Sequence, residues 1–303
     1  MKKVRVPAST SNLGPGFDVL GLALDRYLVV TGEIGQQVPL IITVEGEGKS
    51  HIALDASNLV YRAFCAALRS AGTNPMKEHV TLHLKNDIPA YGGLGGSGAA
   101  CTAGILLADA LYNLELSRAQ MLTIGLSIEG HPDNISASML GGLTVNCYDG
   151  VELHTRSVKI DYPLTIVACS PHFQLLTSEA RKILPSIISR ADVVVNLQNV
   201  ASLVAAMMSG DVEALRYVTA DKVHEQYRAT LIPGFEDVRR SALHAGAISC
   251  NISGSGPTIF CFALQNCEAI ALEMERAFRR VGLESTAAIM KIENHGAAIV
   301  QEL

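Results

Sequence analysis

The chain has 303 residues, of which 49% are hydrophobic and 17% are charged. This length suits two domains, and the composition provides a sizeable core and excludes a largely disordered chain. The formal net charge of −5 makes a nucleic acid or an anionic membrane an unexpected partner. An acidic chain can still bind phosphate when backbone N–H groups make the contacts.

The seven cysteines are odd in number and include no C-x-x-C pair. Most have apolar neighbours, which favours buried free thiols in a reducing compartment over disulfides or a zinc site. Residues 1–10 lack the apolar core of a secretory signal, and no run of 18 uninterrupted apolar residues is present. We therefore expect a cytoplasmic protein without a membrane span.

The first half of the chain mixes strands and helices. Its hydrophobic patterns predict strands over residues 4–7, 27–34, 39–46, 79–89, 141–150 and 151–160. They predict helices over residues 58–71, 99–114 and 117–130, and a short helix from Asn134. Ser117 is expected to cap the third helix, and Pro132 to end it. Polar, turn-rich residues predict a loop over 9–18.

The second half is expected to begin with a strand over 163–171 and to continue with broken helices from Thr177 to about Glu225. Further patterns predict a helix over 235–247, a strand, glycine turn and strand over 249–264, a helix over 267–282 and a strand region over 285–300. Because strands and helices do not alternate regularly, we predict an α+β fold with two domains, 1–155 and 156–303.

Five glycines lie between Gly92 and Gly98, after a strand and before a helix. This segment contains a G-x-G-x-x-G match, but the expected acidic strand end of a dinucleotide fold does not follow. It also lacks the Gly-Lys-Ser/Thr of a P-loop. A glycine turn at a helix N-terminus still presents unpaired N–H donors, so we predict a phosphate site to which Ser97 adds a hydroxyl. The alternative is a tight structural turn.

A second polar segment covers residues 128–134. Glu129 provides a hard oxygen of the kind that Mg²⁺ prefers together with phosphate oxygens. His131, Asp133 and Asn134 add hydrogen-bonding groups for a polar substrate, although each alone also suits a capping or turn role. A zinc site is a weaker alternative, because no further ligands follow at matching spacing.

Two other loops are candidates for binding. Asn12 and Asp18 in the first loop suit an ammonium or hydroxyl group, or Asp18 acts only as a cap. The glycine turn over 253–258 contains Gly254, Ser255 and Gly256 between apolar strands, and alone it is typical of a structural turn, with a functional role as the alternative.

Taken together, these loops resemble the GHMP kinase superfamily, and within it the homoserine kinases, over residues 4 to 300. The segments that carry the resemblance are PASTSNLGPGFDVLGLAL, IPAYGGLGGSGAA, EGHPDNISASMLGGL, LLTSEARKILP, QYRATLIPGF and NISGSGPTIF. The resemblance implies an N-terminal ATP-binding domain with a left-handed β-α-β crossover and a C-terminal ferredoxin-like α/β sandwich. It also implies a kinase that phosphorylates the hydroxyl of L-homoserine with ATP and Mg²⁺, and a possible homodimer.

The resemblance assigns roles to individual residues of this chain. It implies that the nucleotide contacts Asn58, Lys85, Pro89, Gly92, Gly93, Leu94, Gly95, Gly96, Ser97 and Gly98, with Ser97 and Glu129 near the metal. It places the substrate among Asn12, Asp18, His131, Asp133, Asn134, Arg181, Arg228 and Gly254. Catalytic roles are implied for Glu129, Asn134, Thr177 and Arg181, with Thr177 beside the reacting hydroxyl.

The chain departs from the family pattern at one point. The usual Ser-Ser-Ala of the phosphate loop is Gly96-Ser97-Gly98 here, which removes a hydroxyl and adds backbone freedom. We expect nucleotide affinity or preference to differ. No aspartate stands in the segment of Thr177 and Arg181, so we favour a reaction without a side-chain base over indirect help from Asp133. The alternatives are a shikimate- or mevalonate-type kinase and a catalytically silent relative.

Overall fold

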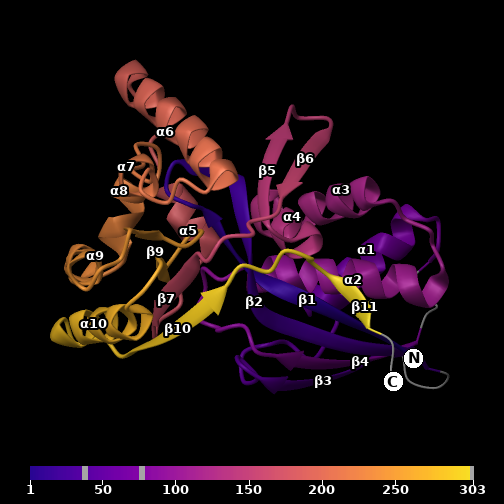
Figure 1. The fold of residues 1–303 in the computed structure, drawn as a ribbon. Helices are drawn as coiled ribbons and strands as arrows, with labels where there is room; N and C mark the ends of the chain where they lie inside the picture. The colour runs from indigo at the N-terminus through magenta and orange to yellow at the C-terminus, as the bar shows by residue number, and fades with distance from the viewer. Residues whose placement is uncertain (36–39, 75–78, 301–303) are drawn as a thin grey trace.

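The computed structural model describes residues 1–35, 40–74 and 79–300, and it contains two β-sheets with helices packed against them (Figure 1). Both helices and strands are abundant, which confirms the α+β class. Pro39, which was expected to open a strand, lies outside the described residues.

The first sheet contains seven strands, and the first four helices of the chain form a layer beside it (Figure 1). Its main path has the order β11-β1-β2-β4-β3, and β5 pairs with β2 and β6. The strands are β1 (Lys2–Asn12), β2 (Gly16–Ile34), β3 (Leu40–Gly46), β4 (Val80–Asn86), β5 (Leu143–Tyr148), β6 (Leu153–Val158) and β11 (Ala298–Val300).

Four helices cover this sheet: α1 (Leu59–Ser70), α2 (Gly96–Tyr112), α3 (Arg118–Glu129) and α4 (Asp133–Leu140). Helices α2 and α4 both contact β1 and β2, and α2 also packs against α1 (Figure 1). Strands β3 and β4 are parallel neighbours joined through α1. This is the β-α-β unit for which the family implies a left-handed crossover, and that handedness stays a prediction.

The second sheet has four antiparallel strands in the order β10-β7-β9-β8. The strands are β7 (Thr165–Pro171), β8 (Ser249–Ile252), β9 (Ile259–Ala263) and β10 (Ser285–Lys291). The helices are α5 (Thr177–Lys182), α6 (Arg190–Ser209), α7 (Leu215–Val218), α8 (Glu225–Arg228), the short η2 (Ala229–Leu231), α9 (Phe235–His244) and α10 (Cys267–Arg280). This chain order and strand order are those of a ferredoxin-like β-α-β-β-α-β unit.

Several element boundaries differ from the sequence expectation; strand β2, for example, begins at Gly16 instead of Tyr27. The loop expected over 9–18 covers only residues 13–15, because the flanking residues belong to β1 and β2. The polar side chains at the end of β1 form hydrogen bonds with buried groups of other segments. Helix α2 begins at Gly96 instead of residue 99. Helix α3 has the expected Ser117 cap and ends at Glu129, with Gly130 as a left-handed C-cap, whereas Pro132 is the N-cap of α4.

The final strand region divides between the two sheets, since β10 joins β7 whereas β11 returns to β1. The division into domains 1–155 and 156–303 stays a prediction. Among the described residues, α6 is the one helix long and apolar enough to span a membrane by length and composition alone. It also takes part in the fold, because Leu203, Ala206 and Met207 are buried and the Asn196 amide donates to the Pro15 carbonyl at 2.8 Å.

Candidate active site

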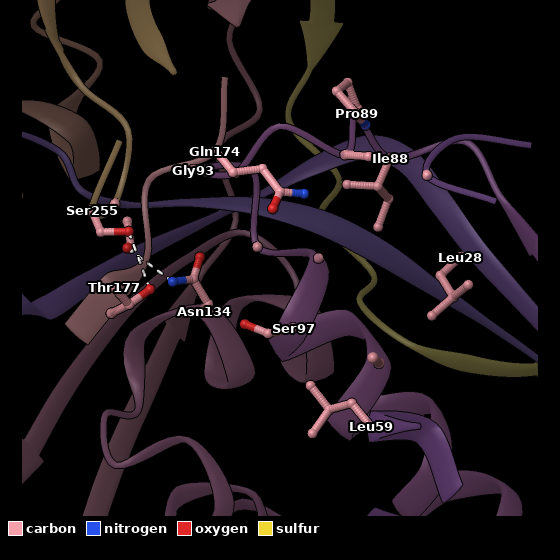
Figure 2. A pocket seen from close by; sticks show the side chains of 18 of the residues that line it. Leu28, Leu59, Ile88, Pro89, Gly93, Ser97, Asn134, Gln174, Thr177 and Ser255 are labelled. Atoms are coloured by element: carbon pink, nitrogen blue, oxygen red, sulfur yellow. Dashed lines mark hydrogen bonds between the residues drawn. The ribbon is translucent and has the colours of Figure 1, made fainter. Parts of the chain in front are cut away.

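A cavity of about 480 Å³ lies where the glycine loop, the end of β1, α4, α5 and the β8–β9 turn converge. One end is apolar, with Leu28, Ile52, Leu59, Ile88 and Pro89 in its lining. The other end is polar and charged. Figure 2 shows Ser97, Asn134, Thr177 and Ser255 on the polar side and Leu28, Leu59, Ile88 and Pro89 on the apolar side. This division suits a ligand with an aromatic part and a charged part.

The glycine loop leads directly into α2. Ala99 N donates to Gly95 O at 2.9 Å, so the N–H groups of Gly96, Ser97 and Gly98 precede the first bond within the helix. With the partial positive charge of a 17-residue helix, these donors form an anion site. Gly95 has a φ of 67°, and a Cβ there would lie 2.0 Å from Ser9 Oγ. Only glycine therefore allows β1 to approach the loop this closely.

Hydroxyl groups from the second half of the chain hold the same loop. Ser253 Oγ donates to the Gly93 carbonyl, and Thr258 Oγ1 donates to the Gly92 carbonyl. Thr10 and Ser170 contact these two hydroxyls at 2.8 and 2.7 Å. The β8–β9 turn thus supports the loop through Ser253 and Thr258. The sequence pointed to the turn, but not to these side chains.

Ser97 and Glu129 meet beside the helix N-terminus. Ser97 Oγ donates to Glu129 Oε2 at 2.6 Å, although 32 residues separate them. A hydroxyl and a carboxylate are hard oxygen donors, and Mg²⁺ in kinases commonly takes one or two protein ligands beside phosphate oxygens. The pair therefore fits Mg²⁺. Among the residues in the described ranges, no group of three or more His, Cys, Asp or Glu side chains is arranged to hold a metal.

The acceptor end of the cavity contains an ion pair between Asp18 and Arg181. Arg181 Nη1 and Nη2 donate to the two carboxylate oxygens at 2.9 and 2.6 Å. Asn12 Oδ1 accepts a bond from Asp18 N at 3.1 Å, and Asn12 Nδ2 donates to Gly254 O at 2.8 Å. The bonds to Asp18 raise the pKa of Arg181. Asn12 therefore positions Asp18, and Asp18 holds the Arg181 fork in place.

Arg228 is 2% exposed and lines the same end of the cavity. Its Nε donates to Ala180 O at 3.1 Å, and Nη1 donates to Gly254 O at 3.0 Å. Burial, together with the neighbouring Arg181 charge, lowers its pKa to about 10. Among the described residues, no protein acceptor meets Nη2, so two N–H donors remain for a ligand.

His131, Asp133 and Asn134 form a linked group at the start of α4. His131 Nδ1 lies 2.9 Å from Asp133 Oδ1, which also accepts from Asn134 N at 2.8 Å. Burial opposes the charge on the imidazole and the charge on the carboxylate, but the contact between the two groups outweighs it. The pKa of His131 is raised and that of Asp133 is lowered. Asn134 joins α4 to β1 through Ser9 Oγ and Ser11 Oγ, both at 3.0 Å.

Thr177 begins α5 and lines the cavity. Its hydroxyl lies 3.3 Å from Ser255 Oγ, as the dashed line in Figure 2 shows. Both side chains extend from the second half of the chain toward the opening above Asn134. The hydroxyl pair therefore belongs to the polar side of the cavity lining (Figure 2).

Family models match both halves of the chain: GHMP kinases N terminal domain over residues 58–142 and GHMP kinases C terminal over residues 199–280. The homoserine kinase of Moorella thermoacetica is 37% identical over 300 residues, covering 99% of this chain and 100% of its own length. That of Caldanaerobacter subterraneus is 37% identical over 302 residues, covering 99% of this chain and 96% of its own length.

The chain belongs to the homoserine kinase family of GHMP kinases.

Solved structures agree with this assignment. A homoserine kinase from Cytophaga hutchinsonii superposes with a TM-score of 0.87 at 28% identity and covers 99% of this chain and 97% of its own. A Leishmania major mevalonate kinase, with a TM-score of 0.74 and 14% identity over 98% of this chain and 97% of its own, shows that the fold is shared more widely. The expected two-domain GHMP kinase fold is confirmed.

The homoserine kinase fold brings most of the expected site residues to the cavity. Those in its lining are Asn12, Asp18, Asn58, Pro89, Gly92, Gly93, Gly95, Gly96, Ser97, His131, Asp133, Asn134, Thr177, Arg181, Arg228 and Gly254. Glu129 is not in this lining but accepts a hydrogen bond from Ser97, which is. Leu94 is buried in the core, and Gly98 packs against Asn134, where a Cβ would lie 2.9 Å from the Asn134 Cβ.

Two residues expected to contact the nucleotide, Lys85 and Asn58, differ in their positions relative to the cavity. Lys85 is exposed on β4, and its neighbours Leu84 and Asn86 face the cavity instead, because side chains alternate along a strand. Asn58 lines the apolar end, but its oxygen caps α1 by accepting from Val60 N, and its amide donates to Ala53 O at 2.7 Å. Lys85 is thus not among the residues that line the cavity, whereas Asn58 lines it and also caps α1; the nucleotide contacts of both residues stay predictions.

Proposed function

We propose that this chain transfers the γ-phosphoryl group of ATP to the side-chain hydroxyl of L-homoserine. The observation that carries the proposal is the single cavity that joins a helix-N-terminal anion site to the Asp18–Arg181 pair and Arg228. The family membership, through relatives named homoserine kinase, supports the same substrate.

The anion site holds the phosphates with backbone N–H groups and the dipole of α2. Mg²⁺ bound by Ser97 and Glu129 would neutralise phosphate charge. The apolar end accepts the base. Asp18, Arg181 and Arg228 line the charged end. There the two guanidinium groups would bind the substrate carboxylate, and Asp18 would bind its ammonium group.

In the reaction, the homoserine hydroxyl oxygen forms a bond to the γ-phosphorus while the bond from that phosphorus to the bridging oxygen breaks. ADP leaves with the electron pair, and the hydroxyl proton passes to a phosphoryl oxygen or to solvent. The lowered pKa of Asp133 makes its carboxylate a weak base. This supports a reaction without a side-chain base, in which positioning and charge stabilisation dominate.

A coupled ADP-release assay with homoserine, mevalonate and shikimate tests the proposal. We expect homoserine to give the highest kcat/KM by at least about 100-fold, since the charged end of the cavity provides partners for both an ammonium and a carboxylate. A higher value with either other acceptor would overturn the substrate assignment. ATP binding without ADP release would favour the silent relative.

We also propose a cytoplasmic location and a homodimer. The seven free cysteines, five of them buried, support a reducing compartment. The homodimer rests on the family resemblance alone. Sedimentation equilibrium of the purified protein measures the oligomeric state directly.

A further inference from the structure

His224 lies just outside the cavity, between the first loop and the arginine pair. The residue precedes α8, and its side chain is fully buried. Its Nε2 lies 2.9 Å from the Gly14 carbonyl oxygen, and its Nδ1 lies 3.4 Å from Arg228 Nη1. The imidazole therefore connects Gly14, in the loop that precedes the β2 residue Asp18, to the helix that carries Arg228.

The two contacts determine the protonation of the ring. A carbonyl oxygen only accepts, so Nε2 carries the hydrogen. A guanidinium only donates, so Nδ1 presents its lone pair. Both contacts are satisfied together only by the neutral tautomer with hydrogen on Nε2.

The charged groups around the ring agree with this state. Burial lowers the pKa of His224, and the Arg228 charge acts in the same direction. The Asp221 carboxylate, 3.8 Å from Nε2, and the more distant Asp18 act against it but do not outweigh burial. The ring is therefore neutral near pH 7.

Phe17 extends the same connection to Arg181. Its ring stacks on His224 with a centroid distance of 5.1 Å and an interplanar angle of 28°. The guanidinium carbons of Arg181 and Arg228 lie 5.3 and 5.0 Å from the Phe17 centroid. One aromatic ring thus lies against both cations, and His224 stacks on that ring.

We propose that neutral His224 is a positioning residue for the phosphoryl acceptor: by accepting a bond from Arg228 Nη1 and supporting Phe17, it directs Arg228 Nη2 toward the carboxylate of the acceptor. This rests on the proposed function, which places that carboxylate at the charged end. Nothing in the inference involves the nucleotide, so the effect belongs to acceptor binding alone.

Two substitutions separate the two nitrogen atoms of the ring. His224→Gln keeps a donor near the position of Nε2 and loses the acceptor for Arg228, whereas His224→Asn keeps an oxygen near the position of Nδ1. We expect His224→Gln to raise the KM for homoserine about 10-fold or more, with kcat and the KM for ATP within about twofold of wild type. His224→Asn should recover part of the loss. His244→Gln, at an exposed histidine of α9, is the matched control.

Equal effects of the Gln and Asn variants, or an equal rise in both KM values, would overturn the proposal, because either result indicates general structural damage. If His224→Gln does not fold, Phe17→Leu should still raise the homoserine KM selectively, and an unchanged KM would count against the proposal.

The tautomer of His224 can be measured from the ¹⁵N NMR signals of its imidazole in the wild-type protein at pH 7.5. We expect the neutral Nε2–H tautomer, and a hydrogen on Nδ1 would overturn the proposal. The kinetic outcomes also separate the two claims. A wild-type protein that releases no ADP with homoserine refutes the proposed function, whereas an active wild type with an unchanged His224→Gln KM refutes only the role of His224.

Discussion

At the residue scale, Glu129 is the carboxylate on which metal binding depends. Its contact with Ser97 places a charged and a neutral oxygen together at the α2 N-terminus. We predict that Glu129→Gln lowers kcat at least about 100-fold without unfolding the chain, because a Mg²⁺ ligand loses its charge. Steady-state assays over a Mg²⁺ titration measure the effect. Glu152→Gln, on the exposed β5–β6 turn, is the control. Near-normal turnover of Glu129→Gln at saturating Mg²⁺ would remove Glu129 from the site.

Gly96 and Gly98 lie in the same helical turn but differ in the space available for a side chain. A Cβ at Gly96 meets no atom within 4 Å, whereas one at Gly98 meets Asn134 Cβ at 2.9 Å. We predict that Gly96→Ser folds like wild type and changes ATP affinity several-fold, since it restores the missing hydroxyl. We predict that Gly98→Ala lowers the free energy of unfolding by about 1–3 kcal/mol. Calorimetric titration and urea unfolding check the two effects. Equal stability losses would contradict the packing described here.

Arg181 acts through the shape of its guanidinium group. It donates to both oxygens of Asp18 and also lies over Phe17. We predict that Arg181→Lys lowers kcat/KM for homoserine roughly 10- to 100-fold, because an ammonium group cannot reproduce two parallel bonds. Substrate-saturation kinetics provide the measurement. Full activity of the lysine variant would show that charge alone is sufficient.

At the element scale, the β8–β9 turn supports the glycine loop from the other half of the chain. Thr258 bonds both Ser170 and the Gly92 carbonyl while fully buried. Thr258→Val should leave the Gly92 carbonyl without its donor and the Ser170 hydroxyl without its acceptor, with a loss of about 1–3 kcal/mol in unfolding free energy. The KM for ATP should also rise more than that for homoserine. Thr43→Val, at an exposed position on β3, is the control. A change confined to the homoserine KM would argue against this support.

At the scale of the whole molecule, stability should respond to pH through Glu225. Burial raises its pKa to about 7 despite bonds from Ile252 N and Asn251 and the nearby Arg239. The folded state therefore holds a proton that the unfolded state, in which the pKa of glutamate is about 4.5, releases at lower pH. The resulting stability is present below about pH 4.5 and is lost as the pH rises to about 7.

Comparison of wild type with Glu225→Gln isolates this contribution. The shift corresponds to roughly 3 kcal/mol at most, because one pKa unit equals about 1.4 kcal/mol. Urea unfolding from pH 4.5 to 8 should show the variant gaining stability relative to wild type as the pH rises. A constant difference across this range would indicate that Glu225 does not titrate in the folded state.

Local patterns in the sequence determined much of the architecture and the phosphate site. Apolar periodicity and the Ser117 cap predicted the helices, and the glycine run before a helix predicted an anion site that needs no lysine. These signals are local, since helix spacing and capping involve residues a few positions apart. The family motifs then supplied the substrate residues.

Only the tertiary structure decided which side chains complete the site. No local pattern separates Ser9, Ser253, Thr258 and His224 from ordinary strand or turn residues. Each contacts a partner at least 125 residues away in the sequence. Side chains alternate along β4, and the packing of this strand places Leu84 and Asn86 at the cavity and Lys85 away from it. Sequence spacing determines local conformation, but hydrogen bonds between distant segments depend on how the two sheets pack, and that packing is set by the whole chain.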